Sequence, residues 1–350
     1  MCQSFCAQNA DRGCHPAVFD DGLIGRTMHR LLDSYLVAAQ IAMLLALGCS
    51  SVPPHPKVDA LEQGFSGRMA RAHLTSLEGL SPRLPGSPAD QIARAYLARE
   101  FRRVGAKSRV LVEGGRHHLI ADLEGDSDDV ILLVAAYPAL RSGRWIDDSG
   151  AALLLELARV IGSTRPPYTL VFALAETPPA PLPLPPSDEA PGGASTGAVP
   201  PSWQPVLTPS DARQRLLEAG HSLARGIEAE GRASGVRAVI VFDTSAAAGQ
   251  QRVARDLRSH PEFRRLFWES AAALGLGSMF PPGGDWSAPD SLHLGFRERS
   301  MDRVLALVHV GGIDDGSENA PRMFDSMGAV SLDALSKLMR RFEKVDAFGR

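Results

Sequence analysis

Short, wholly apolar segments alternate along this chain with longer segments in which apolar residues recur at helical spacing. Residues 130–135 read Val-Ile-Leu-Leu-Val-Ala, a helical pattern follows over 149–159, and residues 169–175 form a second apolar segment. A strand that is apolar throughout is typical of a sheet covered on both faces. The alternation therefore predicts a mostly parallel sheet with helices packed against it.

The same alternation extends over the rest of the chain. It predicts further helices at 58–77, 87–104, 210–233, 259–275 and 331–345 (the last capped by Ser331), and further strands at 108–112, 118–123, 238–242 and 304–310. Residues 178–209 contain eleven prolines and predict a surface insertion without regular structure. Because the alternation resumes afterwards and no repeat is visible, residues 58–347 are predicted to form one domain.

The amino-terminal segment has the pattern of a secretion signal. A basic start at Met28-His29-Arg30 precedes an apolar run over 35–47, which is too short for a comfortable transmembrane helix. The end of the run leads into Ala-Leu-Gly-Cys at 46–49, which resembles a bacterial lipobox with Cys49 as the lipidated residue. We therefore expect a leader at 1–27 ahead of a later start at Met28, a lipoprotein signal at 28–48 and a tether at 49–57. The alternative is a buried helix with an incidental Cys49.

Composition narrows the function classes. The 37 basic and 40 acidic residues give a net charge of -3, whereas a nucleic-acid binder usually carries a basic excess. Of the four cysteines, only Cys49 remains after the predicted cleavage, so no disulfide is expected. These features predict a protein of the bacterial envelope, anchored to outer-membrane lipid on the periplasmic side through Cys49, with no nucleic-acid partner.

Acidic residues stand at the ends of the predicted strands. Glu176 and Asp243 each end an apolar segment, and Asp147 lies in the loop before the helical pattern at 149–159. In open α/β sheets, functional groups gather at the carboxyl ends of the strands. Taken alone, an acidic residue at a strand end is more often a helix cap or a solvated loop residue than a functional group.

Taken in order, these segments resemble the zinc aminopeptidase and glutaminyl-peptide cyclotransferase superfamily over nearly the whole predicted mature chain. The resemblance rests on Arg-Leu-Pro-Gly-Ser-Pro at 83–88, His-Leu-Ile-Ala-Asp-Leu-Glu-Gly at 118–125, Asp-Asp-Ser-Gly at 147–150, the strand ends at Glu176 and Asp243, and His-Leu-Gly-Phe at 293–296. It implies a single three-layer α/β domain with a mixed, mostly parallel sheet. It also implies zinc held by His, Asp and Glu, with a neighbouring Glu that moves protons.

The resemblance also shows which of the superfamily's site positions have changed. Its general base falls on Glu176, and its metal-binding Asp residues fall on Asp243 and on Asp147, the latter if the loop is one residue shorter. Its remaining ligand positions fall on Ala136, Thr177 and Pro321. Three oxygen donors without an imidazole do not make a tight zinc site. We therefore expect no bound cofactor, with Ca²⁺ or Mg²⁺ as the ions that such carboxylates would suit.

The histidines do not supply the missing ligands. His293, with Asp290 before it, matches a pocket-lining position of the superfamily outside the metal's own ligands. His117 and His118 begin a predicted strand, which places them at the opposite end from the expected pocket. Two hypotheses follow: a lipid-anchored protein with a degenerate metal site that binds a peptide or protein without catalysis, or an active metallo-aminopeptidase or glutaminyl cyclase with unusual ligands.

Overall fold

The computed structural model describes residues 64–137, 148–177, 209–243, 252–283, 285–286, 292–299, 301–310 and 320–348. Every described residue belongs to one compact unit, Val52–Arg350. The predicted signal, Cys49 and the tether lie outside the described residues, as do 178–208 of the proline-rich segment. In the part of the chain that is described, no helix is long and apolar enough to cross a membrane.

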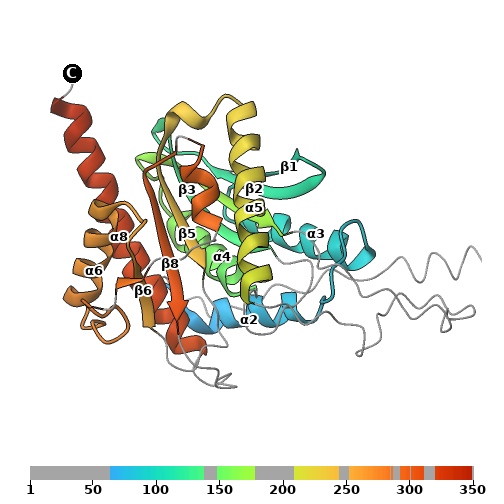
Figure 1. The fold of residues 1–350 in the computed structure, drawn as a ribbon, viewed down its shortest axis with the longest axis horizontal. Coiled ribbons are helices and arrows are strands. Elements are labelled where there is room, and N and C mark those ends of the chain that lie inside the picture. Colours follow the sequence, from blue (N-terminus) through green and yellow to red (C-terminus); the bar gives the residue numbers. More distant parts are fainter. Residues whose placement is uncertain are drawn as a thin grey trace, which may run out of the picture. The chain divides into compact units, whose positions relative to one another are not determined.

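Among the described residues, eight strands form one sheet in the order β1-β2-β4-β3-β5-β8-β6-β7. They are β1 (Lys107–Glu113), β2 (Arg116–Leu123), β3 (Ser127–Tyr137), β4 (Tyr168–Glu176), β5 (Val236–Asp243), β6 (Arg252–Asp256), β7 (Asp285–Trp286) and β8 (Val304–Val310). Figure 1 shows the central strands β3, β5 and β8 side by side. The central strands β4, β3, β5 and β8 are parallel, whereas β2 and β6 join them antiparallel. The predicted mixed, mostly parallel sheet is confirmed.

Helices cover both faces of the sheet, as the alternation predicted (Figure 1). The larger apolar cluster joins one face to α2 (Gly67–Glu78), α3 (Pro88–Arg103), α4 (Ser149–Ile161), α6 (Pro261–Ala273) and α8 (Ala320–Phe348). The smaller cluster joins the other face to α5 (Pro209–Ala229) and α7 (Leu292–Arg297). We call these the α3 face and the α5 face. The three layers confirm the predicted fold class.

The last helix differs from its prediction. It begins at Ala320 rather than at Ser331, which lies fully buried inside α8 instead of capping it. Gly328, within the added turns, lies against the ring of Phe65, where a Cβ atom would stand 2.4 Å from ring carbons. This glycine therefore serves close packing of the helix and does not end it. The predicted start at Ser331 is wrong.

Candidate functional site

The parallel strands end side by side at the carboxyl edge of the sheet. Tyr137 ends β3 and is paired with Glu176, which ends β4. Asp243 ends β5 one position after Phe242, and Phe242 is paired with Ala135 of β3. Neighbouring strands of a sheet lie about 4.8 Å apart. The fold thus brings the strand ends that carry Glu176 and Asp243 to one edge.

Alternation along the strands assigns these side chains to different faces. Leu174 and Phe242 belong to the apolar cluster of the α3 face, and Val241 belongs to that of the α5 face. Successive residues of a strand point to opposite faces. Glu176 therefore falls on the α3 face, and Asp243 falls on the α5 face.

The carboxylate of Glu176 is buried and hydrogen-bonded through both oxygens. The residue is 3% exposed. Its Oε1 accepts a hydrogen bond from Nη2 of Arg94 on α3 at 2.9 Å, and its Oε2 accepts the backbone N–H of His117 on β2. The His117 ring lies near the same oxygen, with Nδ1 3.8 Å from Oε2. Each carboxylate oxygen thus already has a strong donor within the chain.

Arg94 joins this carboxylate to a second one. Its Nε lies 3.0 Å from both carboxylate oxygens of Asp90, one turn earlier on α3. Asp90 also accepts the hydroxyl of Tyr137 at 2.9 Å, and burial raises the pKa of that hydroxyl above its ordinary value. The guanidinium of Arg94 stands over the Tyr137 ring, 5.2 Å from its centroid. The guanidinium of Arg94 therefore contacts two carboxylates and an aromatic ring.

A second buried arginine lies against the same ring. Arg83 stands 5.1 Å from the Tyr137 centroid, and its Nη2 donates to Oδ1 of Asp148 at 2.6 Å. Its Nη1 donates to the carbonyl of Leu77 at 2.7 Å. Asp148 is the residue before α4, directly after the predicted ligand Asp147, which lies outside the described residues. The α3 face thus pairs its buried acids with arginines.

His117 and His118 lie at this edge of the sheet, so the prediction that they lie at the opposite end is wrong. The reason is that β2 runs antiparallel to β4, so the start of β2 meets the end of β4. Nδ1 of His118 accepts the backbone N–H of Glu176 at 3.1 Å, and its Nε2 lies 3.0 Å from the hydroxyl of Ser222. Burial lowers the pKa of His118 to about 3, helped by Arg116 and Arg94. The ring is therefore neutral, with its proton on Nε2.

Comparison with solved structures identifies the fold. A glutaminyl cyclase from an Acidobacteriales bacterium is 17% identical with a TM-score of 0.57, and it covers 84% of this chain and 100% of its own. The Porphyromonas gingivalis glutaminyl cyclase is 17% identical with a TM-score of 0.59, covering 78% and 99%. A Zn-dependent exopeptidase from Parabacteroides distasonis is 18% identical with a TM-score of 0.54, covering 81% and 98%.

This chain has the fold of the glutaminyl cyclases and zinc-dependent exopeptidases. The fold resemblance drawn from the sequence is confirmed. Neither the sequence models of protein families nor the sequences of curated proteins give a match.

The described residues of this glutaminyl cyclase-like fold do not fit zinc. Within the described ranges, no three His, Cys, Asp or Glu side chains are grouped so that they could hold a metal ion. Ala136 and Asp243 directly follow the paired residues Ala135 and Phe242, but the alanine side chain has no donor atom for a metal. The Thr177 hydroxyl lies 3.5 Å from the Tyr137 carbonyl. On the α3 face, the carboxylate of Glu176 is paired with Arg94. Pro321 is part of α8.

His293 lies in a separate buried cluster. Its Nε2 stands 3.1 Å from Oδ2 of Asp256, and both side chains are fully buried. Asp256 also accepts the hydroxyl of Ser259 at 2.8 Å, and the same hydroxyl oxygen accepts the N–H of Ala306. Burial opposes the charge on Asp256, but His293 and Ser259 outweigh it and lower its pKa. The structure groups His293 with Asp256, while its predicted neighbour Asp290 lies outside the described residues.

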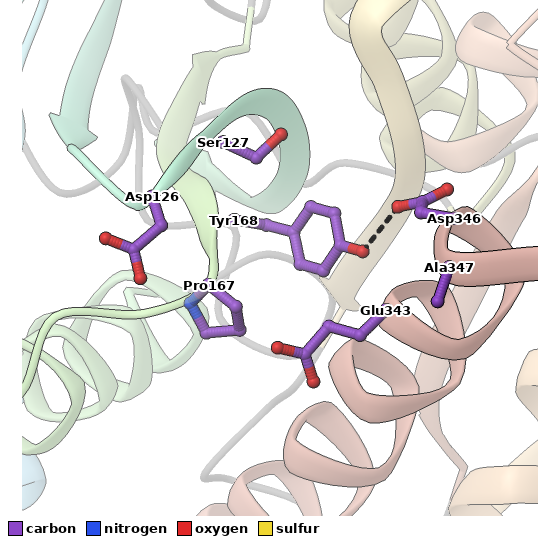
Figure 2. Close-up of a pocket in the computed structure, with 7 residues that line it drawn as sticks. All are labelled: Asp126, Ser127, Pro167, Tyr168, Glu343, Asp346 and Ala347. Atoms are coloured by element: carbon purple, nitrogen blue, oxygen red, sulfur yellow. Dashed lines mark hydrogen bonds between the residues drawn. The ribbon is translucent and has the colours of Figure 1, made fainter. Parts of the chain in front are cut away.

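A pocket of about 310 Å³ lies at the amino ends of the parallel strands, opposite the carboxyl edge. It is formed where β3 and β4 begin and where α8 ends, with the acids Asp126, Glu343 and Asp346 around Tyr168 (Figure 2). The Tyr168 hydroxyl donates to Asp346 at 2.7 Å, and Arg237 pairs with the same carboxylate at 2.9 Å. Its polar groups thus serve contacts within the fold, away from the carboxyl edge.

The sequence analysis missed most of the residues that surround Glu176. Arg94, Asp90 and Tyr137 were not candidates. One signal pointed to them. Asp90 and Arg94 are four residues apart, so they share one side of a helix that follows the Arg-Leu-Pro-Gly-Ser-Pro turn. That spacing predicts the pair but does not reveal which strand end it meets.

Proposed function

We propose that this protein is a lipid-anchored member of the glutaminyl cyclase and zinc exopeptidase superfamily with a degenerate metal site. In this proposal it binds a peptide or a protein at the carboxyl edge of the sheet without catalysis. The observation that carries the proposal is the state of Glu176, the residue that matches the superfamily's general base. Its carboxylate is buried, neutralised by Arg94 and occupied on both oxygens.

The positions that match the metal ligands support the same proposal. By strand alternation, Ala136, Thr177 and Asp243 fall on the α5 face of neighbouring strand ends. A shared face is what a common metal would require of these positions. Of the three, only Asp243 has a carboxylate, and a zinc site needs about four donors, usually with nitrogen or sulfur among them.

Electrostatics add a second line of support. A general base must come within hydrogen-bond reach of the proton that it removes, and the Glu176 residue is only 3% exposed. A guanidinium never loses its charge in a protein, and Nη2 of Arg94 lies 2.9 Å from Oε1 of Glu176, so a substrate would have to compete with a permanent cation for this carboxylate. The residue is thereby suited to hold α3 against β4, and it is poorly suited to accept a substrate proton.

Metal content and turnover test this proposal. We expect the purified full chain to hold far less than one zinc per molecule after incubation with the metal. We also expect no aminopeptidase or pyroglutamate-forming activity above that of Glu176→Gln. The competing hypothesis, an active metalloenzyme, predicts stoichiometric zinc and turnover that Glu176→Gln abolishes. That result would overturn the proposal.

The anchor is a separate part of the proposal and has its own test. It rests on the lipobox-like sequence before Cys49, and it assigns the protein to the periplasmic side of the bacterial envelope. In a bacterial host, Cys49→Ala should move the protein from the membrane fraction to the soluble fraction. Membrane retention of this variant, at wild-type level, would refute the anchor and leave the site hypothesis standing.

A further inference from the structure

Strand β1 forms one edge of the sheet. It pairs with β2 through a two-residue turn, Gly114-Gly115, in which both glycines have positive φ angles of 58° and 74°. Both values are typical of the tight turns that join hairpin strands. Among the described residues, none pairs with the outer side of β1. This side is therefore a row of backbone donors and acceptors that can accept another strand.

The hydrogen bonds of β2 show which backbone groups point outward. Val112 is opposite His117, and the N–H of His117 donates to Glu176 on the far side of β2. This pair is therefore not hydrogen-bonded within the hairpin, so the N–H and C=O of Val112 point away from β2. Antiparallel pairs alternate in this respect. The backbone groups of Val110 and Ser108 consequently point outward as well.

Two exposed side chains of this edge strand are apolar. Val110 and Val112 are 47% and 59% exposed, and they share one face, whereas Leu111 between them is buried on the other. Natural edge strands are commonly blunted by a proline, a bulge or charged side chains. Strand β1 has charges at Lys107, Arg109 and Glu113, but those of Arg109 and Glu113 are already paired within the chain. Residues 107–113 contain no proline, and their pairing with β2 has no bulge.

We propose that β1 binds β1 of a second copy of this chain, antiparallel, with the twofold axis at Leu111. In this register Val110 of each copy lies opposite Val112 of the other copy. The exposed valines therefore cover one another in two equivalent pairs. On the other face, Arg109 lies opposite Glu113 of the second copy, also twice. Both faces of the new strand pair are thus complementary.

The charges select this register over its neighbours. Moving the axis to Arg109 would place the two copies of that arginine opposite each other, which is destabilising. Moving it to Val110 would place Val112 opposite Ser108 and would leave Arg109 opposite Leu111. Arg109 already pairs with Glu230 and Asp122, and Glu113 with Arg225 at 2.8 Å. The added contacts therefore extend charge pairs that are present in each copy.

Sedimentation of the full chain, in detergent where a membrane anchor requires it, tests the association. We expect a reversible dimer, and we expect Val112→Lys to raise its dissociation constant about tenfold or more, since a lysine is typical of protected edges. Val345 on α8 is a valine of similar exposure, 58%, and Val345→Lys is the matched control, expected to leave the dimer unchanged. A wild-type chain that stays monomeric up to its solubility limit would overturn the proposal.

Crosslinking tests the register. Two differently tagged variants, Val110→Cys and Val112→Cys, are mixed under mild oxidation, with the wild-type chain as the control for its own four cysteines. Opposed residues of an antiparallel pair lie within the Cα separation that a disulfide needs. We expect disulfide-linked heterodimers from the mixture and none from either variant alone. Crosslinks from Val110→Cys alone, or none from the mixture, would refute this pairing.

Discussion

The guanidinium of Arg94 pairs with two buried carboxylates, and this determines how a substitution of Arg94 would change the stability of the fold. Asp90 and Glu176 have side chains that are almost inaccessible to water, and each lies within 3.0 Å of Arg94. A buried ion pair contributes little net stability compared with apolar residues of similar volume, but removing one partner leaves a buried charge uncompensated. The arrangement is thus far more sensitive to single than to double substitution.

We therefore expect Arg94→Met to lower the free energy of unfolding by about 3 kcal/mol, as is typical when one partner of a buried pair is removed. Adding Glu176→Gln should recover part of this loss, because one of the two stranded charges is gone. Urea unfolding measures both. Arg165→Met is the control, since Arg165 is 69% exposed in its pair with Asp126; a change of similar size there would contradict the argument.

His118 makes folding stability depend on pH in a defined direction. Its pKa is about 3 in the folded chain and about 6.5 when unfolded. Above pH 6.5 both states have a neutral ring. As the pH falls from 6.5 towards 3, only the unfolded chain binds a proton there, so the free energy of unfolding falls by up to about 1.4 kcal/mol per pH unit.

Between pH 7 and pH 5, the wild-type chain should therefore lose about 2 kcal/mol more unfolding free energy than His118→Gln, whose side chain does not titrate. Urea unfolding at the two pH values gives both numbers, and contributions from other groups cancel in the difference. Equal losses in the two proteins would show that His118 is not held neutral by burial.

At the scale of elements, two helices of the α5 face meet at a pair of glycines. A Cβ atom on Gly295 of α7 would lie 2.3 Å from the backbone nitrogen of His221 on α5 and 2.8 Å from the Cα of Gly220. Backbone atoms cannot move aside as a side-chain end can. The approach of α7 to α5 therefore requires glycine at this position.

Gly295→Ala should accordingly lower the unfolding free energy by about 1–3 kcal/mol, the usual effect of overpacking. Gly277→Ala is the matched control, because nothing lies within 4 Å of a Cβ atom there and its φ is not positive. Thermal or urea unfolding of the two variants distinguishes them. A loss for Gly277→Ala as large as that for Gly295→Ala would contradict this explanation.

Elements with long, regular patterns were predictable from sequence, and short or reversed ones were not. The apolar run at 130–135 lies in β3, and the helical pattern at 149–159 lies in α4. The strand direction of β2 was missed, although Gly114-Gly115 between two strand patterns is a hairpin signal. Five-residue β6, two-residue β7 and six-residue α7 are too short to show a period.

At the scale of the whole molecule, a chain with a degenerate metal site should not depend on zinc for its stability. A ligand that binds only the folded state at a hundred times its dissociation constant adds about 2.7 kcal/mol. We expect the melting temperature of the full chain to be the same in excess zinc and in a chelator. A rise of several degrees in zinc that the chelator reverses would contradict the proposed function.

The fold was predictable because it depends on patterns summed over many residues, whereas the site depends on a few long-range contacts. Arg94 and Glu176 are 82 positions apart, and Arg83 and Asp148 are 65 apart. A periodic pattern of apolar residues does not indicate which helix packs against which strand end. The resemblance located Glu176 at the edge of the sheet, but its buried partner on α3 emerged only from the packing.

The shared face of Ala136, Thr177 and Asp243 has an evolutionary consequence under the proposed function. A reversion of Ala136 to histidine would give one imidazole and one carboxylate, still short of the donors that zinc needs. A reversion of Thr177 to glutamate would introduce a charge at a position that is 3% exposed, where an unpaired charge is costly. Neither step alone offers a benefit that selection can act upon. Loss of the metal is then a one-way step, and descendants of this chain are expected to diversify as binders.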